Sequence, residues 1–172
     1  MIEIKVDDAR VTAALERLAR AATNPAPALK AIGESLVDST KQRFATSTAP
    51  DGSRWAPNSQ TTYEAMVNRF SKGSFRKDGR LNAKGSANVA GKKPLIGETG
   101  LLASTIFYGV EDSAVRWGSP MIYAAMQNFG GKKSDFPNLW GDIPGRQFMG
   151  VSDSDAVMVE QTVEDYLKSA IA

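Results

Sequence analysis

The sequence predicts an α+β fold in which a small antiparallel sheet packs against about three helices, with a long basic loop. Three observations lead to this prediction. Apolar residues recur at three- and four-residue steps in three long segments, as they do in amphipathic helices. Two short strand-like runs follow one another across an acidic turn, and a basic segment separates them from the first two helices. The length of 172 residues fits one domain, so residues 1–172 are expected to form a single domain.

The N-terminal part of the chain predicts one short strand and two helices. Ile2–Val6, with the sequence IEIKV, alternates apolar and polar residues as a half-buried strand does. An amphipathic helix follows from Asp7 or Asp8, either of which suits the N-cap position. The prolines of NPAP at Asn24–Pro27 end this helix, and a second helix then runs to about Phe44.

Trp55 lies in the turn-rich segment that follows the second helix. Pro50, Asp51 and Gly52 supply the turn. A tryptophan in such a segment usually anchors the loop to the core, and this is the favoured interpretation. The alternative is a contact with a partner protein, because tryptophan is enriched at the energetic centres of interfaces.

The chain beyond Leu95 predicts a hairpin, short helices and one long last helix. GETGLLAST indicates a turn and a short helical start, and TIFYGV and VRWGS indicate two strands joined by an acidic turn. MIYAAMQNFG at Met121–Gly130 predicts a short helix closed by glycine, and RQFMGV at 146–151 predicts a last strand. SDSD at Ser152–Asp155 resembles a capping box ahead of the last helix.

The segment 68–94 differs in charge from the rest of the chain. It holds eight basic residues and one acid, a charge of +7, while the remainder holds 13 basic and 18 acidic residues, a charge of −5. We expect a long mobile loop here, with a small hairpin as one option. The loop could be solvated, could dock on an acidic protein surface, or could bind nucleic acid with Phe70 and Phe75 as stacking groups; the third option is the least favoured. The basic residues are Arg69, Lys72, Arg76, Lys77, Arg80, Lys84, Lys92 and Lys93.

Composition excludes most catalytic chemistry. The absence of cysteine and histidine removes thiolate nucleophiles, disulfides, imidazole bases and Cys/His zinc sites. GSANVAGKK at 85–93 resembles the sequence motif of a phosphate-binding loop. It has one residue too many between its glycines, however, and Lys93 stands where the motif needs Ser or Thr. Carboxylate chemistry stays open, although Asp and Glu fall mainly on helix faces and helix starts. We predict no enzyme, no catalytic residue, no cofactor and no metal site.

The sequence shows neither a signal peptide nor an apolar stretch near the roughly 20 residues that a membrane span needs. We therefore expect synthesis in the cytoplasm without export.

Five segments that follow one another in order carry a resemblance to a known family. They are RF at Arg43 and Phe44, PDGSRWAP at 50–57, LIGETGLLASTI at 95–106, WGSPMIYAAMQNFGG at 117–131 and IPGRQFMGVSDSD at 143–155. Together they resemble the phage virion morphogenesis family, which includes tail completion proteins and Mu-like late morphogenesis proteins of tailed bacteriophages. The chain departs from the family pattern at Gln127 and Asn128, where histidine followed by glutamine is usual, and at Pro144–Phe148, where PARPF is favoured.

The resemblance implies a structural protein of the virion neck that acts when the tail is completed or joined to the head. It also implies a ring of identical subunits, with six copies as the expected number. The partners would be further copies of the chain and other neck and tail proteins, with DNA met only in passage and no membrane. The protein would reside in the virion after assembly in the host cytoplasm. The alternative function is that of a small nucleic-acid-binding protein that uses the basic loop 68–94.

A ring requires two different contact surfaces on each copy. The segment 123–150 combines glycine and proline turns with aromatic side chains, which supply large contact area at small entropic cost. These aromatic residues could instead pin the loop to their own domain, and for Phe129 and Phe148 the two interpretations weigh equally. Arg146 suits a bidentate contact with a carboxylate or with backbone carbonyls. The predicted interface residues are Trp55, Phe136, Leu139, Trp140, Arg146 and Phe148.

Overall fold

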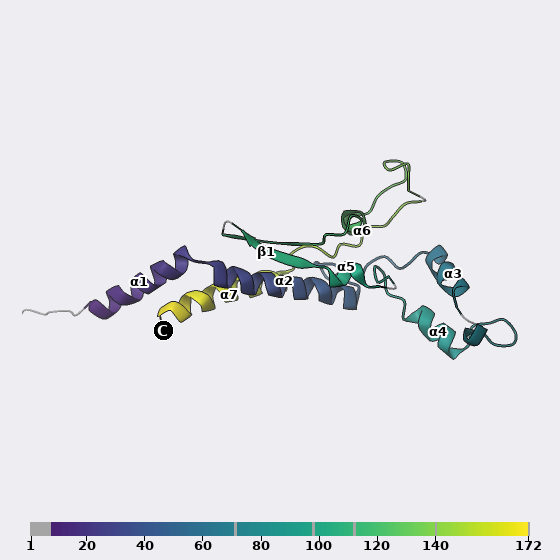
Figure 1. The fold of residues 1–172 in the computed structure, drawn as a ribbon, viewed down its shortest axis with the longest axis horizontal. Helices are drawn as coiled ribbons and strands as arrows, with labels where there is room; N and C mark the ends of the chain where they lie inside the picture. The colour runs from purple at the N-terminus through teal and green to yellow at the C-terminus, as the bar shows by residue number, and fades with distance from the viewer. Residues whose placement is uncertain (1–7, 71, 98, 112, 140, 172) are drawn as a thin grey trace, which may run out of the picture. The chain divides into compact units, whose positions relative to one another are not determined.

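The computed structural model describes residues 8–70, 72–97, 99–111, 113–139 and 141–171, and it confirms the α+β class (Figure 1). The predicted strand Ile2–Val6 lies outside the described residues. Within the described ranges, no helix is long and apolar enough to cross a membrane. The elements in chain order are α1 (Ala9–Thr23), α2 (Ala26–Thr46), α3 (Gln60–Asn68), the 3₁₀ turn η1 (Lys72–Ser74), α4 (Ala83–Ala90), α5 (Leu101–Ser104), β1 (Phe107–Glu111), β2 (Ala114–Gly118), α6 (Ala124–Phe129) and α7 (Asp153–Ile171).

The chain divides into two units. The first holds the described residues up to Ser39, together with Ile106–Gly118 and the residues from Val151 onward. The second holds Thr40–Thr105 and Ser119–Gly150, so α2 begins in the first unit and ends in the second. The single domain expected from the chain length stays a prediction.

Helices α1 and α7 pack against each other in the first unit. The Arg17 guanidinium donates hydrogen bonds to the carbonyls of Ala170 and Ile171 at 3.1 and 3.2 Å. The Tyr166 hydroxyl donates to the Asn24 carbonyl at 2.6 Å, at the end of α1. Asp8 occupies the predicted N-cap position of α1, although its side chain makes no capping hydrogen bond.

The capping box predicted at SDSD is confirmed. The Ser152 hydroxyl accepts a hydrogen bond from the Asp155 N–H at 3.2 Å, and the Asp155 carboxylate accepts one from the Ser152 N–H at 2.9 Å. This reciprocal pair satisfies two of the N–H groups that a helix start leaves without an intrahelical acceptor. It fixes the residue at which α7 begins.

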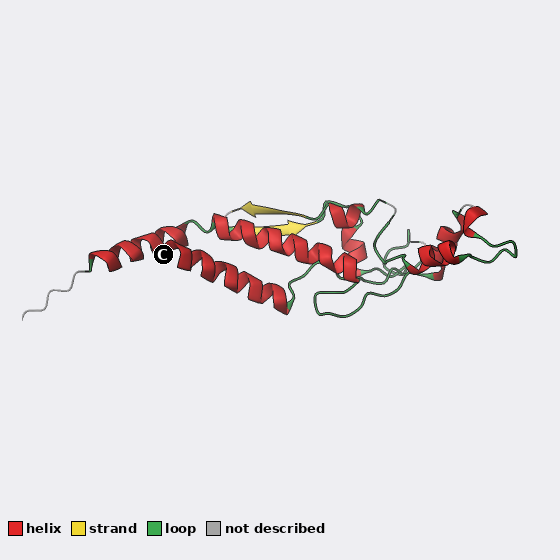
Figure 2. Ribbon diagram, turned by 90° about the horizontal axis from the view of Figure 1, so that it is seen from below, coloured by secondary structure: helices red, strands yellow, loops and turns green. Residues whose placement is uncertain are grey.

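The predicted hairpin is also confirmed, as an antiparallel pair of β1 and β2 that lies beside the first part of α2 (Figure 2). Tyr108 of β1 packs directly on Gly33 of α2, since a Cβ placed on Gly33 would lie 2.3 Å from the Tyr108 ring. The Tyr108 hydroxyl donates to the Glu34 carboxylate at 3.1 Å. Partial burial and then this carboxylate raise the pKa of Tyr108 above its ordinary value. Gly33 therefore provides the space that lets the hairpin dock on the helix.

The second unit contains helix α3, which was not predicted from the sequence. In α3, the Ser59 hydroxyl caps the helix by accepting from the Thr62 N–H at 3.3 Å. The large apolar side chains of α3 are those of Tyr63, Met66 and Val67, and each of them is half-buried. One short stripe of this kind is too weak a pattern to mark a helix, although the serine cap was a usable signal.

The prediction of a loop over residues 68–94 is wrong at Ala83–Ala90, because these residues form helix α4. The optional hairpin is present, as an antiparallel bridge between Phe75 and Leu81. Helix α4 forms because the Asn82 side chain accepts from the Gly85 N–H at 3.0 Å, which caps its first turn. Alanine at three of its eight positions also favours the helix.

Substituting Gly33 by alanine tests the packing of the hairpin on α2. Alanine is the better helix former by about 1 kcal/mol, whereas overpacking against an aromatic ring costs typically 1–3 kcal/mol. We expect Gly33→Ala to lower the free energy of unfolding measured in urea. In a Tyr108→Ser background the same substitution should be neutral or stabilising, because the obstructing ring is gone. An increase in stability in the wild-type background would contradict this packing.

Candidate functional site

Residues 146–150 end the second unit and are held by side chains from three other segments. Arg43 of α2 donates hydrogen bonds to the carbonyls of Phe148 and Gly150 at 2.9 and 2.8 Å. The Asn128 side chain of α6 accepts from the N–H groups of Phe148 and Met149 at 3.0 and 2.9 Å. The Trp55 indole N–H donates to the Gln147 carbonyl at 2.9 Å. Residues 146–150 and the three side chains that hold them, together with Phe44, form a cluster that we call the Phe148 junction.

Three aromatic rings fill the centre of the Phe148 junction. The Phe44 ring meets the Trp55 ring edge-on at 5.4 Å between centroids and the Phe148 ring at 5.1 Å. Phe148 is fully buried and Trp55 is 7% exposed. Packing within the chain therefore accounts for both residues, which agrees with the anchoring interpretation of Trp55; a contact of either with a partner stays a prediction.

The last strand predicted at RQFMGV is wrong, because residues 146–151 form no strand. The backbone groups that a strand would use are occupied by side chains. Asn128 takes the N–H groups of Phe148 and Met149, and Arg43 takes the carbonyls of Phe148 and Gly150. Buried backbone groups need partners, and here the partners are polar side chains instead of a neighbouring strand.

Arg146 makes the bidentate contact that the sequence predicted, with backbone carbonyls as acceptors. Its Nε donates to the Ala56 carbonyl at 2.8 Å and its Nη2 to the Pro57 carbonyl at 2.7 Å. The residue is 8% exposed, and burial lowers the pKa of its guanidinium. Arg146 thus ties residues 146–150 to the segment after Trp55.

Two glycines allow the chain to cross itself beside α6. Gly130 has a φ of +77°, and a Cβ there would lie 2.5 Å from the Gly145 nitrogen. A Cβ on Gly145 would lie 2.8 Å from the Phe129 carbonyl oxygen. Next to this crossing, Gly131 and Ile143 exchange two backbone hydrogen bonds at 2.9 and 2.8 Å. The segment between them therefore forms a loop with a closed base, which leaves α6 and returns to it (Figure 1).

Large apolar side chains are exposed along residues 122–136, which we call the apolar segment. Ile122 is 99% exposed and Phe129 79%, while Tyr123 and Phe136 are 42% and 47% exposed. Of the predicted interface residues in the loop, Phe136 is exposed, Leu139 is half-buried, and Trp140 lies outside the described residues. Ile122 was not selected from the sequence, because a short helix pattern does not reveal which of its residues lacks a neighbour.

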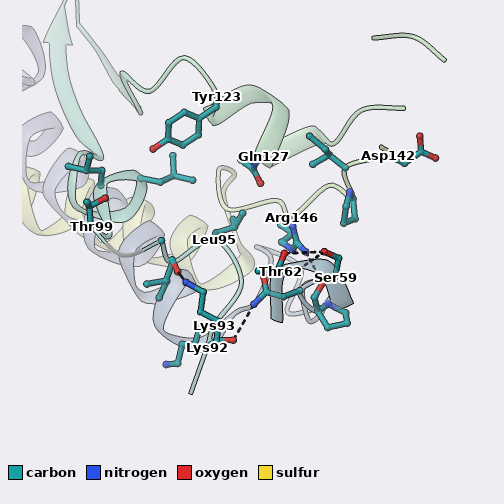
Figure 3. Close-up of a pocket in the computed structure, with 18 residues that line it drawn as sticks. Ser59, Thr62, Lys92, Lys93, Leu95, Thr99, Tyr123, Gln127, Asp142 and Arg146 are labelled. Carbon is teal, nitrogen blue, oxygen red and sulfur yellow. Dashed lines mark hydrogen bonds between the residues drawn. The ribbon is translucent and has the colours of Figure 1, made fainter. Parts of the chain in front are cut away.

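A cavity of about 630 Å³ lies next to the Phe148 junction (Figure 3). Its wall is built from four segments that are far apart in the sequence, and Arg146, Tyr123, Gln127, Leu95 and Lys92 are among its lining residues. This separation explains why the sequence did not predict the cavity.

The lining of the cavity offers little catalytic chemistry. The ammonium groups of Lys92 and Lys93 donate to the carbonyls of Ile96 and Ala45, and Arg146 holds its own two carbonyls. Asp142 is the one carboxylate among the described lining residues, and it accepts from the Lys133 N–H at 2.8 Å. Glycoside hydrolysis, the carboxylate chemistry that the sequence left open, needs a pair of carboxylates, whereas the described lining holds one. In the described part of the chain, no group of three or more Asp or Glu residues could hold a metal ion.

The predicted basic residues fall into two groups. Six of them are exposed around η1, the hairpin and the start of α4, namely Arg69, Lys72, Arg76, Lys77, Arg80 and Lys84. The other two, Lys92 and Lys93, turn to backbone carbonyls beside the cavity. We call residues 60–93 the basic lobe.

Replacing Arg146 by lysine should destabilise the second unit. A lysine keeps the charge but cannot reproduce two parallel donors, so one buried carbonyl loses its partner, at a cost of about 1–3 kcal/mol. The expected result is a lower thermal midpoint in calorimetry. The control is Arg54→Lys at a nearby exposed arginine, which should leave the midpoint unchanged. Equal midpoints for the wild type and Arg146→Lys would contradict the structural role given to the bidentate contact.

Comparison with known proteins places the chain among phage proteins. The chain is 25% identical to "Mu-like prophage FluMu G protein 2" of Haemophilus influenzae over 173 aligned residues, which cover 99% of each chain. No solved structure matches it. The model of the phage virion morphogenesis family matches residues 6–168, and this match includes every element of the Phe148 junction. The chain therefore belongs to the phage virion morphogenesis family, and its role is in the morphogenesis of a phage virion.

Proposed function

We propose that the protein is a non-enzymatic structural component of the neck or tail of a tailed-phage virion, where it acts in tail completion or head-tail joining. In this role it forms a ring of identical copies and contacts other neck and tail proteins. The observation that carries the proposal is the apolar segment, whose large side chains are exposed on a firmly built frame. Family membership supports the structural role, and the relative named as a Mu-like prophage protein supports the phage context.

The first part of the apolar segment, residues 122–129, holds no charged residue and has the composition of a protein contact. Protein interfaces are enriched in aromatic side chains and depleted in charge at their centres. Ile122 is almost fully exposed, and Phe129 follows one short helix later. An isoleucine and a phenylalanine that each bury their side chain contribute about 1.5–3 kcal/mol apiece. A second protein surface would supply that burial.

The frame beneath the apolar segment is suited to a precise contact. Asn128 in α6 is fixed by two hydrogen bonds to the Phe148 junction, and the Gly130–Gly145 crossing and the Gly131–Ile143 bridge close the loop base. Side chains on such a frame lose little conformational freedom on binding. Closure of a ring needs this precision, because each copy must meet the next at the same rotation.

The cavity gives the enzyme alternative little support. The lysine side chains that line the described part of the cavity donate to backbone carbonyls. The same lining holds one carboxylate, that of Asp142, so it offers no pair of carboxylates to act as acid and base. The hydrogen bonds of these lining side chains hold segments of the cavity wall in place.

Replacing the exposed apolar residues tests the contact. We expect the purified protein to form a discrete oligomer in sedimentation velocity at micromolar concentrations, in high as well as low salt, because apolar contacts do not weaken with screening. The double variant Ile122→Asn/Phe129→Asn should shift it to the monomer. Each lost anchor at the centre of an interface costs about 2 kcal/mol or more, which is about 30-fold in affinity per residue.

The matched control is Val157→Asn, which removes an apolar side chain that is 53% exposed on α7. It should leave the oligomer intact. The proposal of a self-assembling ring would be contradicted by a wild-type monomer under all conditions, or by an oligomer that the double variant leaves unchanged.

A further inference from the structure

The basic lobe carries a concentrated positive charge, and among the described residues its fold leaves five of the eight cationic side chains without an internal partner. Residues 60–93 hold eight basic residues against Glu64 and Asp78, a net charge of +6. Both acids are engaged locally, since Glu64 accepts from the Gln60 side chain and Asp78 from the Arg80 N–H. In the described part of the chain, the side chains of Lys72, Arg76, Lys77, Arg80 and Lys84 make no hydrogen bond or ion pair with other residues.

This charge is costly for the isolated protein. Like charges this close in the chain repel one another, and Lys84 lies in the first turn of α4, where the helix dipole disfavours a cation. The five cations without an internal partner in the described structure, Lys72, Arg76, Lys77, Arg80 and Lys84, are stabilised when an anion approaches them.

The cations stand on a folded scaffold. The Asn82 side chain donates to the Gly73 carbonyl at 2.8 Å and accepts from the Gly85 N–H at 3.0 Å, so it joins η1 to α4. Gly85 permits this approach, because a Cβ there would lie 2.6 Å from the Ser74 carbonyl oxygen. Between these anchors, the Phe75–Leu81 bridge closes a hairpin that presents Arg76, Lys77 and Arg80 at its turn. The positions of the charges are therefore defined by the fold.

The surface chemistry of the basic lobe favours a phosphate backbone over an acidic protein. Protein interfaces have an apolar centre and are depleted in lysine. None of the large exposed apolar residues in the described chain lies in residues 60–93, whereas Ile122 and Phe129 provide such a centre elsewhere. Contacts with phosphates need lysine and arginine and no apolar centre.

The same surface favours duplex over single-stranded nucleic acid. Single strands are held by bases stacked on exposed aromatic rings. Phe70 and Phe75 are both half-buried, and Phe70 lines a cavity of the lobe beside Met66. Neither of the rings that the sequence offered for stacking is therefore fully exposed. We propose that the basic lobe binds the phosphate backbone of double-stranded DNA, through Arg69, Lys72, Arg76, Lys77, Arg80 and Lys84, without reading the base sequence.

The salt dependence of DNA binding tests this proposal. The full chain is titrated into a fluorescently labelled random-sequence duplex, and anisotropy is recorded from low to moderate salt. Each phosphate contact contributes about −0.9 to the slope of log affinity against log salt, so six contacts give a slope of about −5. The variant Arg76→Gln/Lys77→Gln/Arg80→Gln should make the slope less negative by up to about 2.7, since it removes three contacts. Two duplexes of unrelated sequence should bind equally well.

The control removes the same charge from other exposed positions. Arg10→Gln/Lys30→Gln/Lys41→Gln lowers the net charge by three outside the basic lobe and should leave the slope unchanged. Circular dichroism checks that both triple variants remain folded. The proposal is overturned if the wild type does not bind DNA at low salt, if both triple variants weaken binding equally, or if polyglutamate competes as well as unlabelled duplex. It does not depend on ring formation, so a monomer that binds duplex in this way supports it while opposing the ring.

Discussion

The second unit depends on one constraint, which is that the backbone around the buried Phe148, at residues 147–150, needs hydrogen-bond partners although it forms neither helix nor strand. An unpaired buried N–H or carbonyl costs about 1–3 kcal/mol, and several such groups meet at this point. Arg43, Trp55 and Asn128 supply the missing partners from three separate segments. Because each of these residues is itself fixed in a helix or by ring packing, satisfying the backbone also sets the positions of α6, of the loop after it and of the chain around Trp55.

This arrangement explains what the family motifs have in common. The segments RF, SRW, QNFGG and PGRQFMG are far apart in the sequence, yet each contributes a residue or a backbone group to the Phe148 junction or to the glycine crossing beside it. These segments, on which the resemblance to the family rests, therefore build the frame, although Asn128 and Gly145 are positions at which the chain departs from the family pattern. The proposed protein contact lies on the apolar segment, which this frame positions, and the proposed DNA contact lies on the basic lobe, which has its own internal anchors. Apolar and charged groups are separated between these two surfaces, as partners of different chemistry require.

Long, strongly periodic elements could be predicted from the sequence, because their pattern repeats often enough to exceed chance. Helices α1, α2 and α7 are of this kind. The hairpin, the capping box and the bidentate contact of Arg146 could be predicted from short motifs and from side-chain chemistry instead. The short helices α3 and α4 depend on single caps, Ser59 and Asn82, which are common residues in loops as well. The strand expected at RQFMGV failed because its backbone pairs with side chains over distances in sequence that no local pattern records. The roles of Arg43 and Asn128 were missed for the same reason.

The central claim is that side chains take the place of a strand ladder at residues 147–150, and amide hydrogen exchange at single residues tests it most directly. The amides of Phe148 and Met149 should exchange slowly, close to the rate of amides in the middle of α2, because the buried Asn128 oxygen holds both of them. The amide of Lys77, in the exposed turn of the basic hairpin, supplies the fast reference within the same chain. Exchange of Phe148 and Met149 as fast as that of Lys77 would contradict the account, since the Phe148 junction would then not hold the backbone on which the apolar segment is built.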